Sequence, residues 1–204
     1  MKIIPIVTGA IAENTYIAFE NGTDAAVVID PGDEAQSIID VLEENAVRPV
    51  YILLTHGHFD HVGAVEEIRN KYGCKVAIHK TDAEMLTQPA TGLFQAVASN
   101  AASPADILLE GDEVIRVGDM EICVMHTPGH TGGCVCYIIG NNMFSGDTLF
   151  MQSIGRTDFS ESDPVAMRDS LDRLNNLDMD YKVFPGHGAS TTLAEEKKYN
   201  PYLS

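Results

Sequence analysis

The pattern of hydrophobic and polar residues predicts strands first, and then strands that alternate with helices. In the opening thirty residues, short apolar runs between turn residues predict strands at Lys2 to Thr8, Asn14 to Glu20 and Ala25 to Ile29. Asn21-Gly22, between the last two runs, is typical of a hairpin turn. From Glu34 to Asn45 the apolar residues recur at helical spacing, which predicts an amphipathic helix.

The rest of the chain continues this alternation. Strands are predicted at further apolar runs bounded by turn residues: Tyr51 to Leu54, Lys75 to Ile78, Ile107 to Leu109, Glu113 to Val117, Met120 to His126, Gly133 to Ile139, Asn142 to Ser145 and Tyr181 to Phe184. Helices are predicted by apolar spacing or by an N-cap residue: His61 to Tyr72, a short helix from a Thr81 cap through Leu86, Asp163-Pro164 to about Asn175, and a final helix capped by Thr192. This order predicts one layered α/β domain over residues 1–204, with helices outside the sheets.

An irregular stretch and four cysteines lie outside this simple pattern. From Thr87 to Pro104 the periodicity is lost, which is typical of a functional loop or of partly helical cover. The cysteines, Cys74, Cys123, Cys134 and Cys136, contain no C-x-x-C pair. We expect them to be small buried hydrophobic residues in a reducing compartment, although Cys134 and Cys136 would face the same side of a strand as a vicinal thiol pair.

Length, composition and charge restrict the classes of function. The chain has 204 residues, 45% of them hydrophobic, which suits a domain whose core can hold an internal site. Thirty Asp and Glu against 13 Lys and Arg give a formal net charge of −17, which would repel nucleic acid and anionic membrane surfaces. No apolar run approaches the ~20 residues that span a bilayer, and Met1 to Val7 is too short for a signal-peptide core. We therefore expect a cytoplasmic protein that acts on a small molecule, and the sequence indicates no oligomeric state.

The strongest candidate chemistry lies in one short motif. Thr55-His56-Gly57-His58-Phe59-Asp60-His61 places three imidazoles and a carboxylate after a predicted buried strand and before a predicted helix. Alternate residues of an extended loop can direct His56 and His58 to one point, while Asp60 and His61 turn with the helix toward a second point. Neutral imidazole nitrogens and carboxylates suit zinc, and also iron or manganese. The motif therefore predicts a metal site.

Three further candidates lie in turns that directly follow predicted strands. His130 lies in Thr-Pro-Gly-His-Thr-Gly, Asp147 in Ser-Gly-Asp-Thr and His187 in Pro-Gly-His-Gly. Ligands converge at strand ends in layered α/β proteins, and the flanking glycines let the backbone turn sharply. With the first motif, these residues give seven ligands, enough for two metal ions that share one carboxylate and one water.

With these motifs the sequence resembles the metallo-β-lactamase superfamily and, within it, the shorter glyoxalase II-like hydrolases, relatives of hydroxyacylglutathione hydrolase. The resemblance runs from Asn14 to the C-terminus and includes, besides the motifs above, Val28 to Gly32, Ser145 to Phe150 and Gly155 to Phe159. It implies a four-layer αββα sandwich and two divalent metal ions, Zn²⁺ in the first instance, with Fe or Mn as alternatives. The implied ligands are His56, His58 and His130 for the first ion, Asp60, His61 and His187 for the second, and Asp147 as the bridge.

The resemblance also implies a function, which is the metal-dependent hydrolysis of small thioesters such as hydroxyacylglutathione. Two divalent ions would lower the pKa of a bridging water from 15.7 toward ~7, so that hydroxide attacks the thioester carbonyl. Asp60 would be the catalytic residue that orients this nucleophile, besides being a ligand. Arg156 lies in a loop that the family places near the substrate, where it is either a substrate contact or part of a structural ion pair.

Two other enzyme classes remain open at this point. Persulfide dioxygenases with a single iron share H-x-H-x-D-H and a segment like Gly155 to Phe159, although Pro185 to Gly188 has the hydrolase form. A lactonase would need the same metals. Longer glyoxalase II enzymes carry an added helical domain that supplies much of the glutathione site, whereas this chain ends seventeen residues after His187, so we expect weak binding of glutathione conjugates.

Two residues near the motifs, Asp30 and His126, are candidates for supporting roles. Asp30, at the end of the third predicted strand, is placed to orient a metal-bound histidine through its free ring nitrogen. His126, four residues before His130, is a weaker candidate for the same role. His79 is interpreted as an ordinary strand-end residue.

Overall fold

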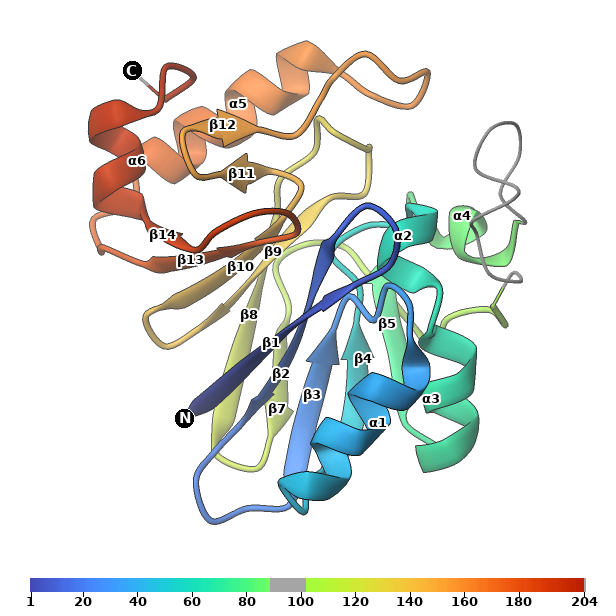
Figure 1. Cartoon of the computed structure of the whole chain (residues 1–204). Helices are drawn as coiled ribbons and strands as arrows, with labels where there is room; N and C mark the ends of the chain where they lie inside the picture. Colours follow the sequence, from blue (N-terminus) through green and yellow to red (C-terminus); the bar gives the residue numbers. More distant parts are fainter. Residues whose placement is uncertain (89–101, 204) are drawn as a thin grey trace.

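The computed structural model describes residues 1–88 and 102–203, and in these residues two six-stranded sheets face each other (Figure 1). The strands of the first sheet, in spatial order, are β1 (Lys2–Thr8), β2 (Glu13–Phe19), β3 (Ala25–Ile29), β4 (Arg48–Leu53), β5 (Lys75–His79) and β6 (Ile107–Leu109). Those of the second are β14 (Thr191–Thr192), β13 (Lys182–Pro185), β10 (Asn142–Gly146), β9 (Val135–Ile139), β8 (Met120–His126) and β7 (Val114–Val117). A separate small ribbon pairs β11 (Leu149–Phe150) with β12 (Ser153–Ile154).

Both sheets contain parallel pairs whose strand ends carry the candidate motifs. In the first sheet β3, β4, β5 and β6 run parallel, and in the second β10 and β13 do. The carboxyl ends of these strands lead into the turns that carry His56, Asp147 and His187. The arrangement therefore collects residues that are far apart in the sequence at one edge of the sandwich.

Helices cover the outer face of each sheet. The helices of the first half are α1 (Ala35–Glu44), α2 (Phe59–Val62), α3 (Val65–Tyr72) and α4 (Ala83–Thr87), and those of the second are α5 (Pro164–Asn175) and α6 (Leu193–Tyr199). One apolar cluster joins α1 and α3 to the first sheet, a second fills the space between the sheets, and a third joins α5 and α6 to the second sheet. The four-layer αββα sandwich implied by the resemblance is confirmed.

Strand β2 lies in the interior and is covered on both of its faces. All seven of its residues are buried, because alternate side chains enter two different cores. Ile17 packs in the cluster under the helices, while Tyr16 and Ala18 pack between the sheets. A strand covered on both faces needs apolar residues on both faces. The three buried polar residues at its start, Glu13, Asn14 and Thr15, are exceptions, and Glu13 lies beside the centre described below.

Several predicted boundaries differ from the structure. The helix predicted over His61 to Tyr72 is two helices, because Ala64 N donates to Pro31 O (2.9 Å) at the break between α2 and α3. Thr81 does not cap α4: Asp82 precedes that helix, and its carboxylate accepts from Gly57 N (3.1 Å) and Thr131 Oγ1 (2.6 Å) rather than capping. The predicted caps Asp163 and Thr192 are confirmed by bonds from Val165 N, Ala166 N and Glu195 N.

The remaining expectations concern the cysteines, the irregular stretch and membrane association. Cys74, Cys134 and Cys136 are buried, whereas Cys123 is exposed on β8, so the expectation of burial is wrong for Cys123. Most of the irregular stretch, residues 89–101, lies outside the described residues. Among the helices that the structure describes, none is long and apolar enough to cross a membrane.

Candidate metal centre

The structure brings the seven predicted ligands together at one edge of the sandwich. They come from the loop after β4, from α2, and from the turns after β8, β10 and β13. Their donor atoms form three overlapping groups in which all atoms lie within 4.8 Å of one another: His56 with His58 and His130, His56 with His61 and Asp147, and Asp60 with His61 and His187.

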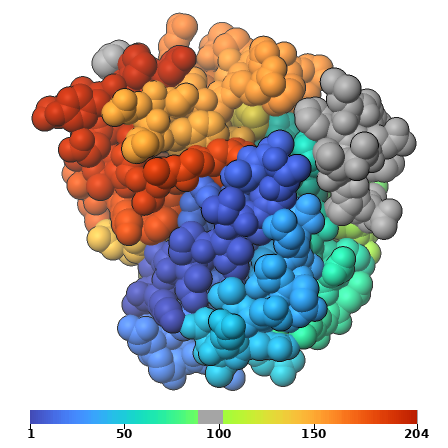
Figure 2. Space-filling model, viewed as in Figure 1, coloured from blue at the N-terminus to red at the C-terminus, as the bar shows by residue number. Residues whose placement is uncertain are grey.

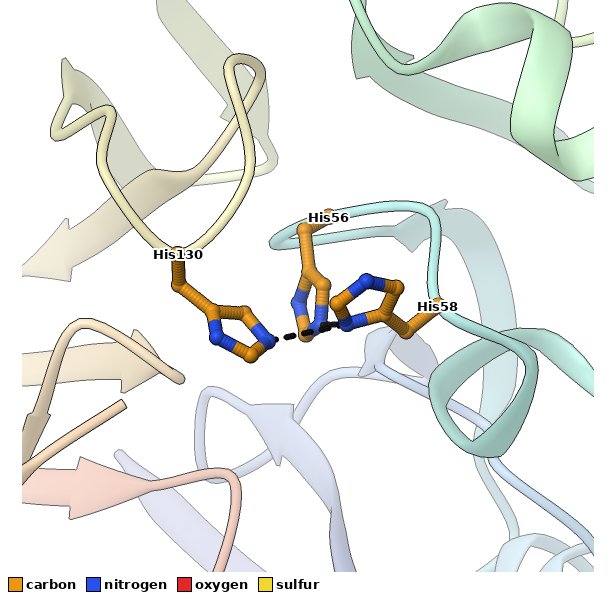
Figure 3. A group of neighbouring side chains, drawn as sticks. All are labelled: His56, His58 and His130. Atoms are coloured by element: carbon orange, nitrogen blue, oxygen red, sulfur yellow. Dashed lines mark hydrogen bonds between the residues drawn. The ribbon is translucent and has the colours of Figure 1, made fainter. Parts of the chain in front are cut away.

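The first group consists of three imidazoles whose inner nitrogens converge (Figure 3). His58 Nδ1 lies 3.0 Å from His56 Nε2 and 2.8 Å from His130 Nε2. His56 and His130 are buried, and the ring of His58 stands nearly perpendicular to both. These three nitrogens are the ones that would contact a common ion.

The outer nitrogen of each ring faces an acceptor. His130 Nδ1 donates to the Arg156 carbonyl oxygen (2.8 Å), and His58 Nε2 lies 3.1 Å from Glu161 Oε1. His56 Nδ1 lies 3.1 Å from Thr55 Oγ1, and that hydroxyl accepts because its own proton goes to Asp30 Oδ2 (2.6 Å). A neutral imidazole has one N–H, so these partners assign the proton to the outer nitrogen of each ring and leave lone pairs on the inner ones. Three lone pairs this close suit a cation between them.

The second group is joined to the first through Asp147. His187 Nε2 lies 3.2 Å from Asp60 Oδ2, and His61 Nε2 lies 3.5 Å from both Asp60 Oδ2 and Asp147 Oδ1. Asp147 Oδ2 also lies 3.5 Å from His130 Nε2 of the first group. The position of the Asp147 carboxylate, between the two groups, is the one that a bridging ligand requires.

Two buried atoms at this junction have no hydrogen-bond partner among the described residues, namely His61 Nε2 and Asp147 Oδ1. Leaving a buried polar atom unpaired costs about 1–3 kcal/mol, so such atoms need a ligand or a reason. Both face the space between Asp60, His61 and Asp147. The residues present therefore fit metal ions at this centre.

Asp30 occupies the supporting position that the sequence suggested. Its Oδ2 accepts from His61 Nδ1 (3.0 Å), and its Oδ1 accepts from Thr55 N (2.7 Å). The His61 proton is thereby assigned to Nδ1, so Nε2 is left for the centre. Burial lowers the pKa of His61, but the carboxylates of Asp60, Asp147 and Asp30 raise it well above its ordinary value overall.

Glu13 is a member of the centre's surroundings that sequence reasoning missed. Its side chain is fully buried behind His61, with Oε1 3.8 Å from His61 Nδ1 and Oε2 accepting from Thr8 Oγ1 (2.9 Å). Burial raises the pKa of this carboxyl well above its ordinary value. The signal in the sequence was a glutamate directly before an apolar strand, a position that needs a partner inside the protein.

The turn after β13 approaches the ligands so closely that Gly186 has no room for a side chain. A Cβ at this position would overlap Asp147 Oδ1 and would lie 2.7 Å from His61 Cε1. Gly186 N also donates to Gly146 O (2.9 Å), which joins the two turns that carry His187 and Asp147. The glycine in this motif is thus required by the close approach of the backbone to Asp147 and His61.

Arg156 contacts the centre through its backbone rather than through its guanidinium. The guanidinium is exposed, pairs with both carboxylate oxygens of Asp158 (2.6 and 2.7 Å) and lies 4.3 Å from the centroid of the Phe159 ring. The carbonyl oxygen of the same residue holds His130, as described above. A substrate could contact the guanidinium only by displacing the Asp158 carboxylate from it.

The two other histidines form a pair of their own. The rings of His79 and His126 stack with centroids 4.1 Å apart and an interplanar angle of 11°. His126 Nε2 donates to Gly132 O (2.9 Å), so His126 holds the turn that carries His130 instead of contacting a predicted ligand. His79 is buried at the end of β5, where the sequence placed it.

Fold and centre together define a four-layer α/β protein with a two-part candidate metal site at the strand ends. Residues 8–187 match the family model described as the metallo-beta-lactamase superfamily, and the chain belongs to this superfamily. It is 33% identical to the probable metallo-hydrolase YqgX of Bacillus subtilis and 33% identical to the hydroxyacylglutathione hydrolase GloC of Haemophilus influenzae. Each of these matches covers 100% of the chain and 98% of the relative.

Solved structures show the same fold over 98–100% of this chain. The BLEG-1 B3 metallo-beta-lactamase superposes with a TM-score of 0.93 and 35% identity over 100% of both chains. The protein TTHA1623 in a di-iron-bound form gives 0.87 and 36% over 98% of this chain and 100% of its own. ETHE1 from Myxococcus xanthus gives 0.83 and 28% over 98% of this chain and 84% of its own.

Proposed function

We propose that the protein hydrolyses small thioesters, namely hydroxyacyl conjugates of a low-molecular-weight thiol, with two divalent metal ions that are Zn²⁺ in the first instance. The observation that carries the proposal is the pair of ligand groups joined at Asp147. The 33% identity to a hydroxyacylglutathione hydrolase over the whole chain supports the substrate class. The −17 charge supports a small-molecule substrate rather than nucleic acid or a membrane surface. We propose the cytoplasm as its location, and no described helix is long and apolar enough to cross a membrane.

Each residue of the centre has a stated task in this proposal. His56, His58 and His130 would hold the first ion, and Asp60, His61 and His187 the second, with Asp147 shared between them. Bound divalent ions supply a lowered pKa for a coordinated water and polarisation of a carbonyl oxygen. Asp60 faces His187 through Oδ2 at 3.2 Å, and we assign to its carboxylate the orientation of the attacking water.

A thioester suits a centre of this kind because its leaving group needs little help. A thiolate with a pKa of about 8.5 departs without a dedicated general acid. The sequence motifs that carry the ligands contain no lysine or tyrosine that would serve as one. An amide substrate, by contrast, would need a proton for its leaving nitrogen.

Two alternatives use the same ligands and therefore belong in the test. A lactonase would hydrolyse an ester in place of a thioester, and a persulfide dioxygenase would need one iron instead of two ions. The Asp60, His61 and His187 group favours two ions over one. The structural likeness to a protein described as a B3 metallo-beta-lactamase makes a β-lactam the third comparison substrate.

The test combines metal analysis with a substrate panel. We expect elemental analysis of protein purified without added metal to give two ions per chain, and steady-state kinetics to give faster turnover of lactoyl thioesters than of lactones or β-lactams. One iron per chain with oxygen consumption on a persulfide would replace the proposal by the dioxygenase. Two ions with a preference for lactones or β-lactams would replace it by the corresponding hydrolase.

We also propose that the Arg156 guanidinium binds the carboxylate of an anionic thiol carrier, which takes the place of the Asp158 carboxylate. The change Arg156→Ala is then expected to raise KM for an anionic thioester several-fold more than for a neutral thioester of the same acyl group, because the lost contact is made equally in the ground and transition states. The matched control is Asp158→Ala, which frees the guanidinium and is expected to lower KM for the anionic substrate. Equal effects of Arg156→Ala on both substrates would leave Arg156 with the structural role alone.

A further inference from the structure

The segment from Gly155 to Asp163 lies against the first group of histidines at several points. Arg156 O accepts from His130 Nδ1 (2.8 Å), and Ser162 Oγ donates to His130 O (2.6 Å). The ring of Phe159 packs edge-on against His58 and His130, with centroids 5.3 and 5.7 Å apart. Glu161 completes this set of contacts through His58 Nε2 at 3.1 Å.

The three rings of this group differ in how their outer nitrogens are held. His56 bonds to the hydroxyl of its own neighbour Thr55, within the buried part of the protein, and His130 bonds to a backbone carbonyl. His58 instead bonds to a carboxylate that lies 103 residues away in the sequence, on a loop where the Glu161 side chain is 38% exposed. The partner of the outer nitrogen of His58 is therefore one side chain that can be changed without touching the core.

The Glu161 carboxylate is itself held in place. Its Oε2 accepts from Ser160 Oγ (2.8 Å), which directs Oε1 toward the imidazole. The segment that carries it is anchored beyond Glu161 by Asp163 N, which donates to Gly129 O (2.8 Å), and by the cap that Asp163 makes on α5. A fixed acceptor on the outer side of a ring selects both the ring's orientation and the nitrogen that carries the proton.

We propose that Glu161 is a positioning residue that fixes the ring and the protonated nitrogen of His58, and thereby sets the affinity of the three-histidine group for its metal ion. The carboxylate holds the proton on Nε2 and leaves Nδ1 as the lone pair that faces His56 and His130. Without the Glu161 carboxylate, the His58 proton can move to Nδ1. This nitrogen faces His56 and His130 and would then have no lone pair for a metal ion. This inference rests on the metal centre of the proposed function but not on its substrate.

The size of the expected effect follows from other metal sites. Removal of a hydrogen-bonding partner of a metal-bound histidine costs 10–100-fold in metal affinity or activity. The second group is oriented by a different carboxylate, since Asp30 and not Glu161 holds His61. The loss should therefore fall on one of the two ions, which makes it visible as a change in stoichiometry.

The experiment measures binding of Zn²⁺ and Co²⁺ to the metal-depleted protein by competition with a chromogenic chelator, and records the absorption spectrum of the Co²⁺ form. We expect Glu161→Ala to weaken one of the two binding steps 10–100-fold and to alter the Co²⁺ spectrum. Glu161→Gln keeps an oxygen acceptor and should stay within about threefold of wild type, which a role in charge alone would not allow. The matched control Asp169→Ala, which removes an exposed carboxylate of α5, the helix that follows this loop, should bind both ions as wild type does.

Each other outcome overturns a defined statement. Wild-type affinity for both ions in Glu161→Ala, with a folded circular dichroism spectrum, would overturn the inference about Glu161 alone. A loss in Glu161→Gln equal to that in Glu161→Ala, or an equal loss in Asp169→Ala, would overturn the positioning role in favour of local charge. A wild-type protein that binds neither ion would overturn the metal centre itself and the inference with it.

Discussion

At the scale of single residues, Asp147 is the residue that lies between the two ligand groups of the centre. Its carboxylate contacts both ligand groups, with Oδ1 3.5 Å from His61 Nε2 and Oδ2 3.5 Å from His130 Nε2 and 3.8 Å from His187 Nε2. We expect Asp147→Ala to lower kcat by about 10³-fold, because several kcal/mol of metal-derived stabilisation need both ions together. His130→Ala leaves the second group intact and should retain partial metal content. Elemental analysis and kinetics of the two variants check this, and an Asp147→Ala protein with two ions and near-normal turnover would contradict it.

Gly186 gives a second prediction at this scale. A methyl group there would overlap the Asp147 carboxylate and press on the ring of His61. Gly186→Ala should therefore bind fewer than two Zn²⁺ per chain while its far-UV circular dichroism stays that of wild type. Ser190→Ala, an exposed change shortly after His187, is the control and should bind both ions. Full Zn²⁺ occupancy in Gly186→Ala would show that the turn can move away from the ligands.

That the seven candidate ligands lie together could be predicted from the sequence, but the residues that orient them could be predicted only in part. The ligands lie in short motifs at predicted strand ends, so a rule about strand ends was enough to collect them. Asp30 could be suggested because it ends a strand in the same way. Glu161 and the Arg156 carbonyl could not, because a contact across 103 residues or through a backbone oxygen leaves no pattern in the side-chain sequence.

At the scale of elements, side chains of α3 bind the segment of residues 103–106 that leads into β6. Glu66 accepts from Ser103 N (2.9 Å) and Ser103 Oγ (3.0 Å), while Arg69 donates to Pro104 O (2.9 Å) and pairs with Asp106 (3.0 Å). The hydrogen bond from the Ser103 backbone is the main reason that the pKa of Glu66 lies below its ordinary value. A small part of the protein's stability is therefore linked to the ionisation of this carboxyl.

The sign of this linkage predicts how the contribution of Glu66 to stability changes with pH. A glutamate whose pKa is lower in the folded state stabilises the protein above its unfolded pKa of about 4.3, and this contribution is lost as the pH falls through the folded pKa. Glu66→Gln should lower Tm by about 1–3 °C at pH 7 and by less at pH 3.5. Glu67→Gln, next along the same helix, is the control. A Tm difference that grows on acidification would refute the linkage.

The elements that the sequence did not predict are too short to show periodicity or arise from a tertiary contact. Strands β11, β12 and β14 have two residues each, which is too short for any alternation to be seen. The break between α2 and α3 arises from a tertiary contact, the bond from Ala64 N to Pro31 O, while the apolar spacing of Val62, Val65 and Ile68 continues across it. Longer elements with clear periodicity, such as α1 and α5, were predicted to within a residue or two.

At the scale of the whole molecule, the apolar clusters lie in layers and the centre lies at their edge. The three clusters consist of hydrophobic residues and contain none of the seven ligands. Because the core lies apart from the centre, chelation should leave the far-UV circular dichroism spectrum unchanged. It should abolish activity, because the proposed hydrolysis needs the metal ions. Loss of tightly bound ions should lower Tm by roughly 8–16 °C for a site held at about 1,000 times its Kd. Loss of secondary structure on chelation would instead mark the ions as part of the folding core.

The start of β2 lies against the turn after β13, and Figure 2 shows the N-terminal and C-terminal parts of the chain in contact. Asn14 Nδ2 donates to Pro185 O and Gly188 O, partners 171 and 174 residues away. Contacts of such separation form late, because a long loop must close first. At about 5–20 residues per second, synthesis reaches His187 roughly 6–26 s after His58. If the centre binds two ions as proposed, the group of His56, His58 and His130 is synthesised first, and the group of Asp60, His61 and His187 is complete only once translation has delivered His187.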